Sequence, residues 1–127
     1  METDVTEKEI EQRKLRTPNR NELEMYGKIT LLTGVKNLKV MCEDGVERVC
    51  RLPGKMFKHI WVKPNDIVIV KLWDFQPSKG DIVWRYVGYQ INELEKRGEL
   101  DKLYQHTGDV KGTHKMDTIF QEHTKHK

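Results

Sequence analysis

Cysteine is scarce in this sequence, which limits the covalent and metal chemistry that the chain can support. Of 127 residues, only Cys42 and Cys50 are cysteines, with no CxxC spacing and no histidine close by. Zinc sites need several such ligands at short spacing. If Asp44-Gly45 forms a two-residue hairpin turn, Cys42 lies opposite Glu47 and the two thiols fall on opposite faces of the sheet. The sequence therefore predicts reduced thiols, with neither a disulfide nor a metal site.

Long apolar runs and catalytic motifs are also missing. No stretch approaches the roughly 18 apolar residues that a membrane helix requires, and the first 16 residues are charged where a signal peptide is apolar. The acidic residues do not gather into a pair suited to general acid–base catalysis. No GxxxxGK[ST] motif is present to hold a nucleotide phosphate. We therefore predict a soluble, cytoplasmic protein without catalytic residues, without a cofactor and without a membrane partner.

The positive charge of the chain is small in total but concentrated in one place. The formal net charge is +3, from 23 Lys and Arg against 20 Asp and Glu. Residues 48–63, with the sequence RVCRLPGKMFKHIWVK, contain five Lys or Arg and no acid. A basic stretch that also carries aromatic residues is typical of a surface that binds a phosphate backbone. The position of the charge therefore predicts a polyanionic partner.

Five stretches rich in β-branched and aromatic residues predict five strands. Residues able to form turns separate these strands. The only candidate helical turn, Lys55–His59, lies between the third and fourth strands. Closing so small a sheet removes its exposed edges, which favours an all-β, five-stranded Greek-key barrel of the oligonucleotide-binding (OB) type. The predicted strands are 24–32, 37–42, 47–52, 66–72 and 81–87, and the predicted turns are Thr33-Gly34, Asp44-Gly45, Pro64-Asn65 and Ser78-Lys79-Gly80.

The two ends of the chain differ from this middle part in composition. Residues 1–20 have mixed charge and few large apolar side chains, so they are predicted to be a flexible tail ahead of a barrel domain at 21–89. Apolar residues at helical spacing predict a helical extension over 90–105 that packs on the barrel. Residues 106–127 are predicted to be a second flexible tail. Its histidines have no packing face that would fix the geometry of a metal site.

Six segments of this middle part follow one another at near-constant spacing. They are CEDG at 42–45, RLPGKM at 51–56, IWV at 60–62, DIVIV at 66–70, WDFQ at 73–76 and DIVWRY at 81–86. Together they resemble the translation initiation factor 1A family, the archaeal and eukaryotic counterpart of bacterial initiation factor 1, and the resemblance runs from about Thr17 to Leu100. It implies a non-enzymatic OB-fold factor that binds the aminoacyl-tRNA site of the small ribosomal subunit, contacts rRNA, and promotes initiation complex assembly and start-site selection.

The resemblance also implies partners. These are the rRNA and proteins of the small ribosomal subunit and other initiation factors, with the free protein expected to be a monomer. Eukaryotic relatives end in a long acidic tail that docks on the subunit-joining GTPase, whereas this sequence ends in EHTKHK. Residues 45–50 look eukaryotic and residues 73–75 and 82–86 look archaeal, so archaeal, eukaryotic and viral origins all remain open.

The predicted RNA-binding residues lie in and around the basic stretch. Their cations can replace condensed counterions on RNA, and Gly54 lets the backbone approach a phosphate, although a tight turn would also explain it. Trp61 either stacks on an unpaired base or caps the barrel. Phe57 and His59 stand where relatives often have a permanent cation, and an exposed Phe57 can stack on a base or touch a ribosomal protein. The full set is Arg48, Arg51, Gly54, Lys55, Phe57, Lys58, His59, Trp61, Lys63 and Arg85, with Lys39 and Lys71 as possible additions.

Two other groups of residues are given roles. Arg13, Lys14, Arg16 and Arg20 of the N-terminal tail are expected to become ordered only against rRNA or protein on the ribosome. Trp73, Phe75 and Trp84 are predicted to fill the barrel and its seam with the following helix, because large aromatic side chains contribute most when they are buried.

Two other classes of function use the same barrel. A general single-stranded RNA or DNA binder of the cold-shock or S1 type displays several aromatic residues on its second and third strands, and residues 37–52 contain none. An enzyme such as a nuclease needs a cluster of carboxylates that the sequence does not offer. The initiation-factor interpretation is therefore preferred, with the general nucleic-acid binder as the alternative.

Overall fold

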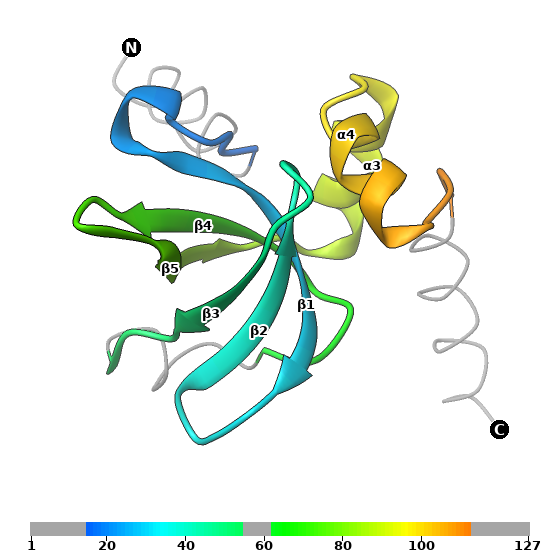
Figure 1. The fold of residues 1–127 in the computed structure, drawn as a ribbon. Coiled ribbons are helices and arrows are strands. Elements are labelled where there is room, and N and C mark those ends of the chain that lie inside the picture. Colours follow the sequence, from blue (N-terminus) through cyan, green and yellow to red (C-terminus); the bar gives the residue numbers. More distant parts are fainter. Residues whose placement is uncertain (1–14, 55–61, 113–127) are drawn as a thin grey trace, which may run out of the picture.

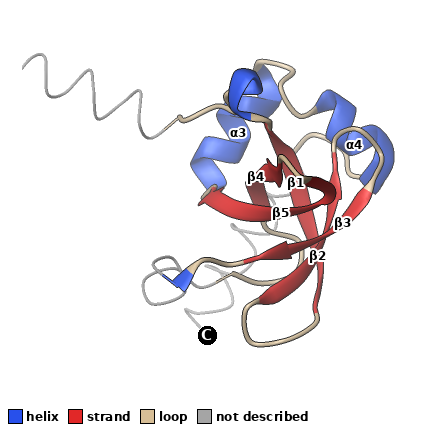
Figure 2. Ribbon diagram, turned by 60° about the vertical axis from the view of Figure 1, so that its left-hand side comes forward, coloured by secondary structure: helices blue, strands red, loops and turns tan. Residues whose placement is uncertain are grey.

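The computed structural model describes residues 15–54 and 62–112, in which a closed five-stranded barrel carries helices on one side (Figure 1, Figure 2). The strand order around the barrel is β1-β2-β3-β5-β4. Neighbouring strands are antiparallel except for β3 and β5, which are parallel. This is the topology of the OB fold, and the predicted fold class is confirmed. The elements are η1 (Arg20–Glu22), β1 (Glu24–Leu32), β2 (Asn37–Cys42), β3 (Glu47–Arg51), β4 (Ile67–Trp73), β5 (Gln76–Arg85), α3 (Gly88–Lys96) and α4 (Asp101–Thr107).

Two apolar clusters hold these elements together, and β4 belongs to both. Successive side chains of a strand point to opposite faces. Residues Ile67–Val70 are nevertheless all buried, because an apolar cluster covers each face of β4. Val68 and Val70 point into the barrel, whereas Ile67 and Ile69 pack beneath the helices. The cluster under the helices also contains Tyr26, Tyr86, Ile91, Leu94, Leu100, Leu103 and Tyr104. The helical segment therefore covers an apolar outer face of the barrel.

The hairpin between β4 and β5 differs from the prediction. Its turn is at Asp74-Phe75, and the predicted turn Ser78-Lys79-Gly80 lies inside β5. Closure of the barrel explains the difference, because β5 pairs with β3 through Val49↔Lys79 and Cys50↔Gly80. A Cβ on Gly80 would lie 2.8 Å from the carbonyl oxygen of Lys71, so Gly80 allows two strands to approach closely and does not form a turn.

The cysteines are also placed differently from the prediction. The β2–β3 connection uses four residues, 43–46, so Met41 and not Cys42 lies opposite Glu47. A change of one residue in register moves every side chain of a strand to the other face, and both thiols consequently point into the barrel, free and buried. Burial raises the pKa of Cys50 to about 12 and also raises that of Cys42. Both thiols therefore stay protonated and unreactive near neutral pH.

Residues 15–20 and 106–112 contact the barrel, although tails were predicted there. Arg16 donates hydrogen bonds to the carboxylate of Glu24 at 3.0 Å and to the carbonyl of Val83 at 3.2 Å. At the other end, Lys28 and Asp109 form an ion pair of 2.7 Å. Such polar contacts help to offset the entropy of ordering a chain that has few apolar residues, and composition does not reveal them. Residues 1–14 and 113–127 of the predicted tails lie outside the described residues.

None of the helices in residues 15–54 and 62–112 has the length and apolar character needed to cross a lipid bilayer. Within the same residues, no group of three or more His, Cys, Asp or Glu side chains is placed to hold a metal ion.

Candidate nucleic-acid interface

Half of the predicted RNA-binding residues are described by the structure. Lys55, Phe57, Lys58, His59 and Trp61 lie outside the described residues, as do Arg13 and Lys14. The chain leaves the described part at Gly54 and returns at Val62, and both ends are anchored. The amide of buried Leu52 donates a 2.7 Å hydrogen bond to the carbonyl of Lys36, and Val62 packs against the cluster inside the barrel.

Arg51 lies beside the first of these ends, on the outer face of the barrel. It is 55% exposed, and its Nε is 3.4 Å from Oδ1 of Asp81, the residue opposite it on β5. Lys71 is the partner of Asp81 on β4, so its ammonium belongs to the same face. Arg51 and Lys79 lie over the ring of Trp73, at 5.7 and 5.8 Å from its centre. Three strands therefore contribute three cations, Arg51, Lys71 and Lys79, to one outer face.

Lys79 was missed by the sequence analysis because it was assigned to a turn. The signal that would have found it is the spacing of two between Lys79 and Asp81, which extends the strand alternation toward the N-terminus.

Lys63 and Arg85 come together at the second end, around the carboxylate of Asp66. Oδ2 of Asp66 accepts hydrogen bonds from the backbone amide of Lys63 at 3.0 Å and from Nε of Arg85 at 3.1 Å. Asn65, in the left-handed conformation with φ of 79°, turns the chain between Lys63 and Asp66. The described chain therefore stops three residues after Arg51 and resumes one residue before Lys63.

Gly54, where the segment begins, is not required for a tight turn. It is not among the glycines with positive φ, and among the described residues the atom nearest to a Cβ at this position is Nζ of Lys36, at 3.8 Å. Two roles were considered for Gly54, a tight turn and close approach to a phosphate. The backbone angle does not support the first, and the second stays a prediction.

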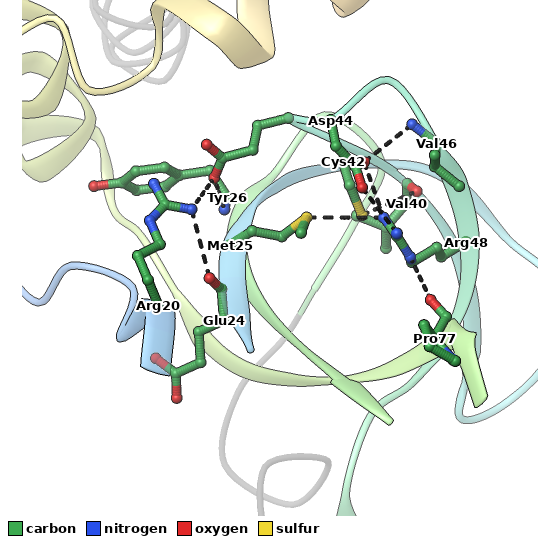
Figure 3. A network of polar contacts seen from close by, with 11 residues as sticks. Arg20, Glu24, Met25, Tyr26, Val40, Cys42, Asp44, Val46, Arg48 and Pro77 are labelled. Carbon is green, nitrogen blue, oxygen red and sulfur yellow. Dashed lines mark hydrogen bonds and ion pairs between the residues drawn. The ribbon is translucent and has the colours of Figure 1, made fainter. Parts of the chain in front are cut away.

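Arg48 does not lie on this surface, which contradicts its prediction as an RNA contact. It is 7% exposed and closes one end of the barrel (Figure 3). Its Nη1 and Nη2 donate to both carboxylate oxygens of Asp44, at 2.9 and 2.8 Å, and its Nε donates to the carbonyl of Pro77 at 2.7 Å. These hydrogen bonds raise the pKa of Arg48 and lower that of Asp44. The charge of Arg48 is thus used within the barrel.

Trp73 and Phe75 do not fill the barrel, so that prediction is wrong for both. Trp73 is the last residue of β4 and Phe75 lies in the β4–β5 turn. Their rings stack on each other at 5.6 Å and 25°, and Phe75 is 84% exposed. Trp84 is half-buried, as predicted for the seam, and packs against the cluster beneath the helices. The guanidinium of Arg16 lies over the Trp84 ring at 5.7 Å.

Arg16 and Arg20 have partners in the chain itself and do not depend on rRNA for their order. In addition to its contacts with Glu24, Val83 and Trp84, Arg16 accepts a hydrogen bond at its carbonyl from the hydroxyl of Tyr86. Arg20 pairs with Glu43 at 2.8 Å, and this hydrogen bond raises the pKa of Arg20. Both side chains therefore fix the start of the domain on the barrel.

Comparison with known proteins identifies the family. A family model described as translation initiation factor 1A / IF-1 matches residues 12–108. The chain belongs to the translation initiation factor 1A family. The resemblance noted in the sequence is confirmed, and the matched range includes both groups of cations and the segment that joins them.

Archaeal members of the family are similar over most of their length. Translation initiation factor 1A of Archaeoglobus fulgidus is 48% identical over 87 residues, which are 68% of this chain and 90% of the relative. The factor of Picrophilus torridus is 47% identical over 87 residues, 68% of this chain and 81% of the relative. A solution structure of translation initiation factor 1 from the Wolbachia endosymbiont of Brugia malayi is 28% identical with a TM-score of 0.42, covering 51% of this chain and 78% of that one.

Proposed function

We propose that this initiation factor 1A family member binds the aminoacyl-tRNA site of the small ribosomal subunit through rRNA. There it promotes assembly of the initiation complex and selection of the start site. The observation that carries the proposal is the placement of cations at both described ends of segment 55–61. Arg51, three residues before Gly54, shares its outer face with Lys71 and Lys79, and Lys63 and Arg85 lie at the end that begins with Val62.

Each group keeps some positive charge available for phosphate. Arg51 remains 55% exposed beside Asp81, and such an exposed ion pair holds its partners only weakly. The side chain of Lys63 is exposed at the second end. With Lys55 and Lys58 between them in sequence, these cations supply the several phosphate contacts that a salt-dependent RNA interaction needs.

The proposed partners are small-subunit rRNA, ribosomal proteins and other initiation factors. We assign no catalytic role to the protein and expect it to be a monomer when free.

A general single-strand binder is the less favoured function. In such proteins aromatic side chains on the second and third strands stack on successive bases. Here the outward positions of β2 and β3 are Asn37, Lys39, Met41, Glu47, Val49 and Arg51. The face that would carry a row of bases therefore has no stacking side chain.

Binding to purified small subunits tests the proposal directly. We expect the protein to cosediment with small and not with large subunits, with an affinity that falls as salt rises, because release of counterions dominates phosphate contacts. Titrations at two salt concentrations measure this. Equal affinity for both subunits, or affinity for neither, would contradict the proposed function.

Replacing Lys55 and Lys58 together by Ala tests the role of the basic segment. Each lost phosphate contact should reduce the steepness of the fall of log affinity with log salt concentration by about 1. The slope of the double variant should therefore be less steep than that of the parent by about 1 to 2. The matched control is Lys96→Ala with Lys102→Ala, two exposed lysines on the helices, which should leave the slope unchanged. If both double variants lose the same slope, binding reflects total charge and the basic segment has no special role.

A further inference from the structure

An open groove lies between the start of the domain and the β4–β5 hairpin, and Lys71 of the first group of cations is one of its lining residues. Its volume is about 530 Å³, and η1 forms one side and the hairpin the other. The backbone hydrogen bond from the amide of Leu72 to the carbonyl of Leu23, at 3.0 Å, ties the two sides together. Figure 1 shows the hairpin projecting from the barrel below the segment that contains η1. The lining residues are Asn21, Glu22, Leu23, Lys71, Leu72, Trp73, Asp74, Phe75 and Asp81.

The aromatic wall of this groove is held in place. The indole Nε1 of Trp73 donates a 3.1 Å hydrogen bond to Asp81, and Arg51 and Lys79 lie over the same ring. Phe75 stacks on Trp73 and leaves 84% of its surface exposed. A large apolar side chain that is exposed but fixed by its neighbours is characteristic of the anchor of an interface.

The charge of the lining decides what kind of ligand fits. Three carboxylates, those of Glu22, Asp74 and Asp81, line the groove together with a single ammonium, that of Lys71. Lys71 already pairs with Glu22 at 3.2 Å, and Asp81 is shared by Arg51 and Trp73. A phosphate entering the groove would meet mainly negative charge. A cation is attracted to it, and a planar cation can also stack on an aromatic ring.

We propose that this groove binds an arginine side chain from a basic segment of a partner protein. The guanidinium stacks on the open face of Phe75, where, among the described residues, no cation is found. Its donors reach the carboxylate of Asp74, which stands next to Phe75 in the turn, and such charge-assisted hydrogen bonds are stronger than neutral ones. This contact goes beyond the proposed rRNA interaction, because it is made to protein, by Phe75 and Asp74, which are not among the proposed rRNA-binding residues.

The test uses the free, full-length protein and a peptide of three Arg-Gly repeats. The reference peptide has citrulline in place of each arginine, which keeps the shape and removes the charge. We expect the arginine peptide to shift the NMR signals of the Trp73 indole and of residues 74–76, and the citrulline peptide to leave them unchanged. An equal response to both peptides, or no response to either, would overturn the proposal. Because no ribosome is present, the result does not depend on the proposed rRNA binding.

Variants assign the contact to the two groups that make it. Phe75→Ala and, separately, Asp74→Asn should each weaken peptide binding roughly five- to tenfold, as expected for loss of a cation–π contact or of one charged hydrogen bond. Tyr89→Ala removes another exposed aromatic side chain, 63% exposed on α3, and should leave binding unchanged. Equal losses in all three variants would contradict the proposal. So would a hexauridylate that shifts the Trp73 and Phe75 signals when the arginine peptide does not, since the groove would then be a site for RNA.

Discussion

Replacing Arg48 by Ala is expected to lower the free energy of unfolding by about 2 to 4 kcal/mol, because it removes one partner of a largely buried ion pair. The change leaves the carbonyl of Pro77 without its donor and Asp44 without its bidentate partner. It also empties the end of the barrel that the side chain closes beside Met25 (Figure 3). The upper end of the range for buried pairs is not expected, since Asp44 is 37% exposed and water can solvate part of its charge. Thermal and urea unfolding of the two proteins measure the difference.

Arg51→Ala is the matched control for this change. Arg51 is three residues further along β3 but points outward, and its ion pair with Asp81 is exposed. Its loss should change stability by no more than about 0.5 to 1 kcal/mol, while weakening binding to small subunits. A similar loss of stability in both variants would mean that Arg48 is not the internal support described above.

The pH dependence of Arg48→Ala gives an independent check. Arg48 lowers the pKa of Asp44 in the folded protein, mainly through its side-chain hydrogen bonds. A carboxyl whose pKa is lowered by folding contributes stability above its unfolded pKa, and that contribution is lost as the pH falls through the folded pKa. The parent and the variant should therefore differ most near neutral pH and converge on acidification. A difference that stays constant into strongly acidic solution would show that the ion pair is not its source.

Much of the barrel could be predicted from local patterns, because strand alternation depends on the residues of each strand alone. β1 and β2 have the predicted bounds, and β3 and β4 differ by a single residue at their ends. The fifth strand was predicted too short because its first part pairs in parallel with β3, a contact between segments far apart in sequence. The spacing of Lys79 and Asp81 is compatible with a longer strand, but nothing local in residues 76–80 indicates that this strand pairs with β3.

One wrong turn length accounts for the error about the direction of the two thiols. With a two-residue turn at Asp44-Gly45, the side chains of β3 that point outward in the structure would point into the barrel, and those that point inward would point outward. The four-residue connection reverses that assignment, so Cys50 and Arg48 point into the barrel and Arg51 points out. The partners of Arg48 could not be predicted locally either, since Pro77 is 29 positions away in the chain.

The stacked pair Trp73 and Phe75 was misassigned for a related reason. Trp73 and Phe75 are large aromatic residues of the kind found in protein cores, but whether they are buried depends on where the β4–β5 hairpin turns. With the turn at Asp74-Phe75, the pair lies at the tip of the hairpin. Aromatic residues at such a tip are available for binding, and the groove beside them is therefore a finding of the structure and not of the sequence.

Gly80→Ala is expected to lower the free energy of unfolding by about 3 kcal/mol, at the upper end of the usual cost of inserting a methyl group into a packed region. The new Cβ would lie 2.8 Å from the carbonyl oxygen of Lys71 and 2.7 Å from Cγ1 of Val70. The valine side chain can rotate, but the carbonyl belongs to the backbone of β4, so the two strands must separate. The separation occurs at Leu72↔Gly80, next to the site where β5 also pairs with β3.

The control for Gly80→Ala is Gly54→Ala at the start of the basic segment, where the nearest atom of the described residues to a new Cβ is Nζ of Lys36 at 3.8 Å. The backbone φ of Gly54 is not positive, so an alanine fits there without strain. The free energy of unfolding should change by less than about 1 kcal/mol, and we expect a small increase because alanine lowers the entropy of the unfolded chain. If Gly54 allows the backbone to approach an rRNA phosphate closely, the Gly54→Ala variant should melt close to the parent and still bind small subunits less tightly. Calorimetry of both variants, with cosedimentation of Gly54→Ala, separates the two roles of glycine. Equal melting of Gly80→Ala and the parent would contradict the close packing of β4 and β5 on which closure of the barrel depends.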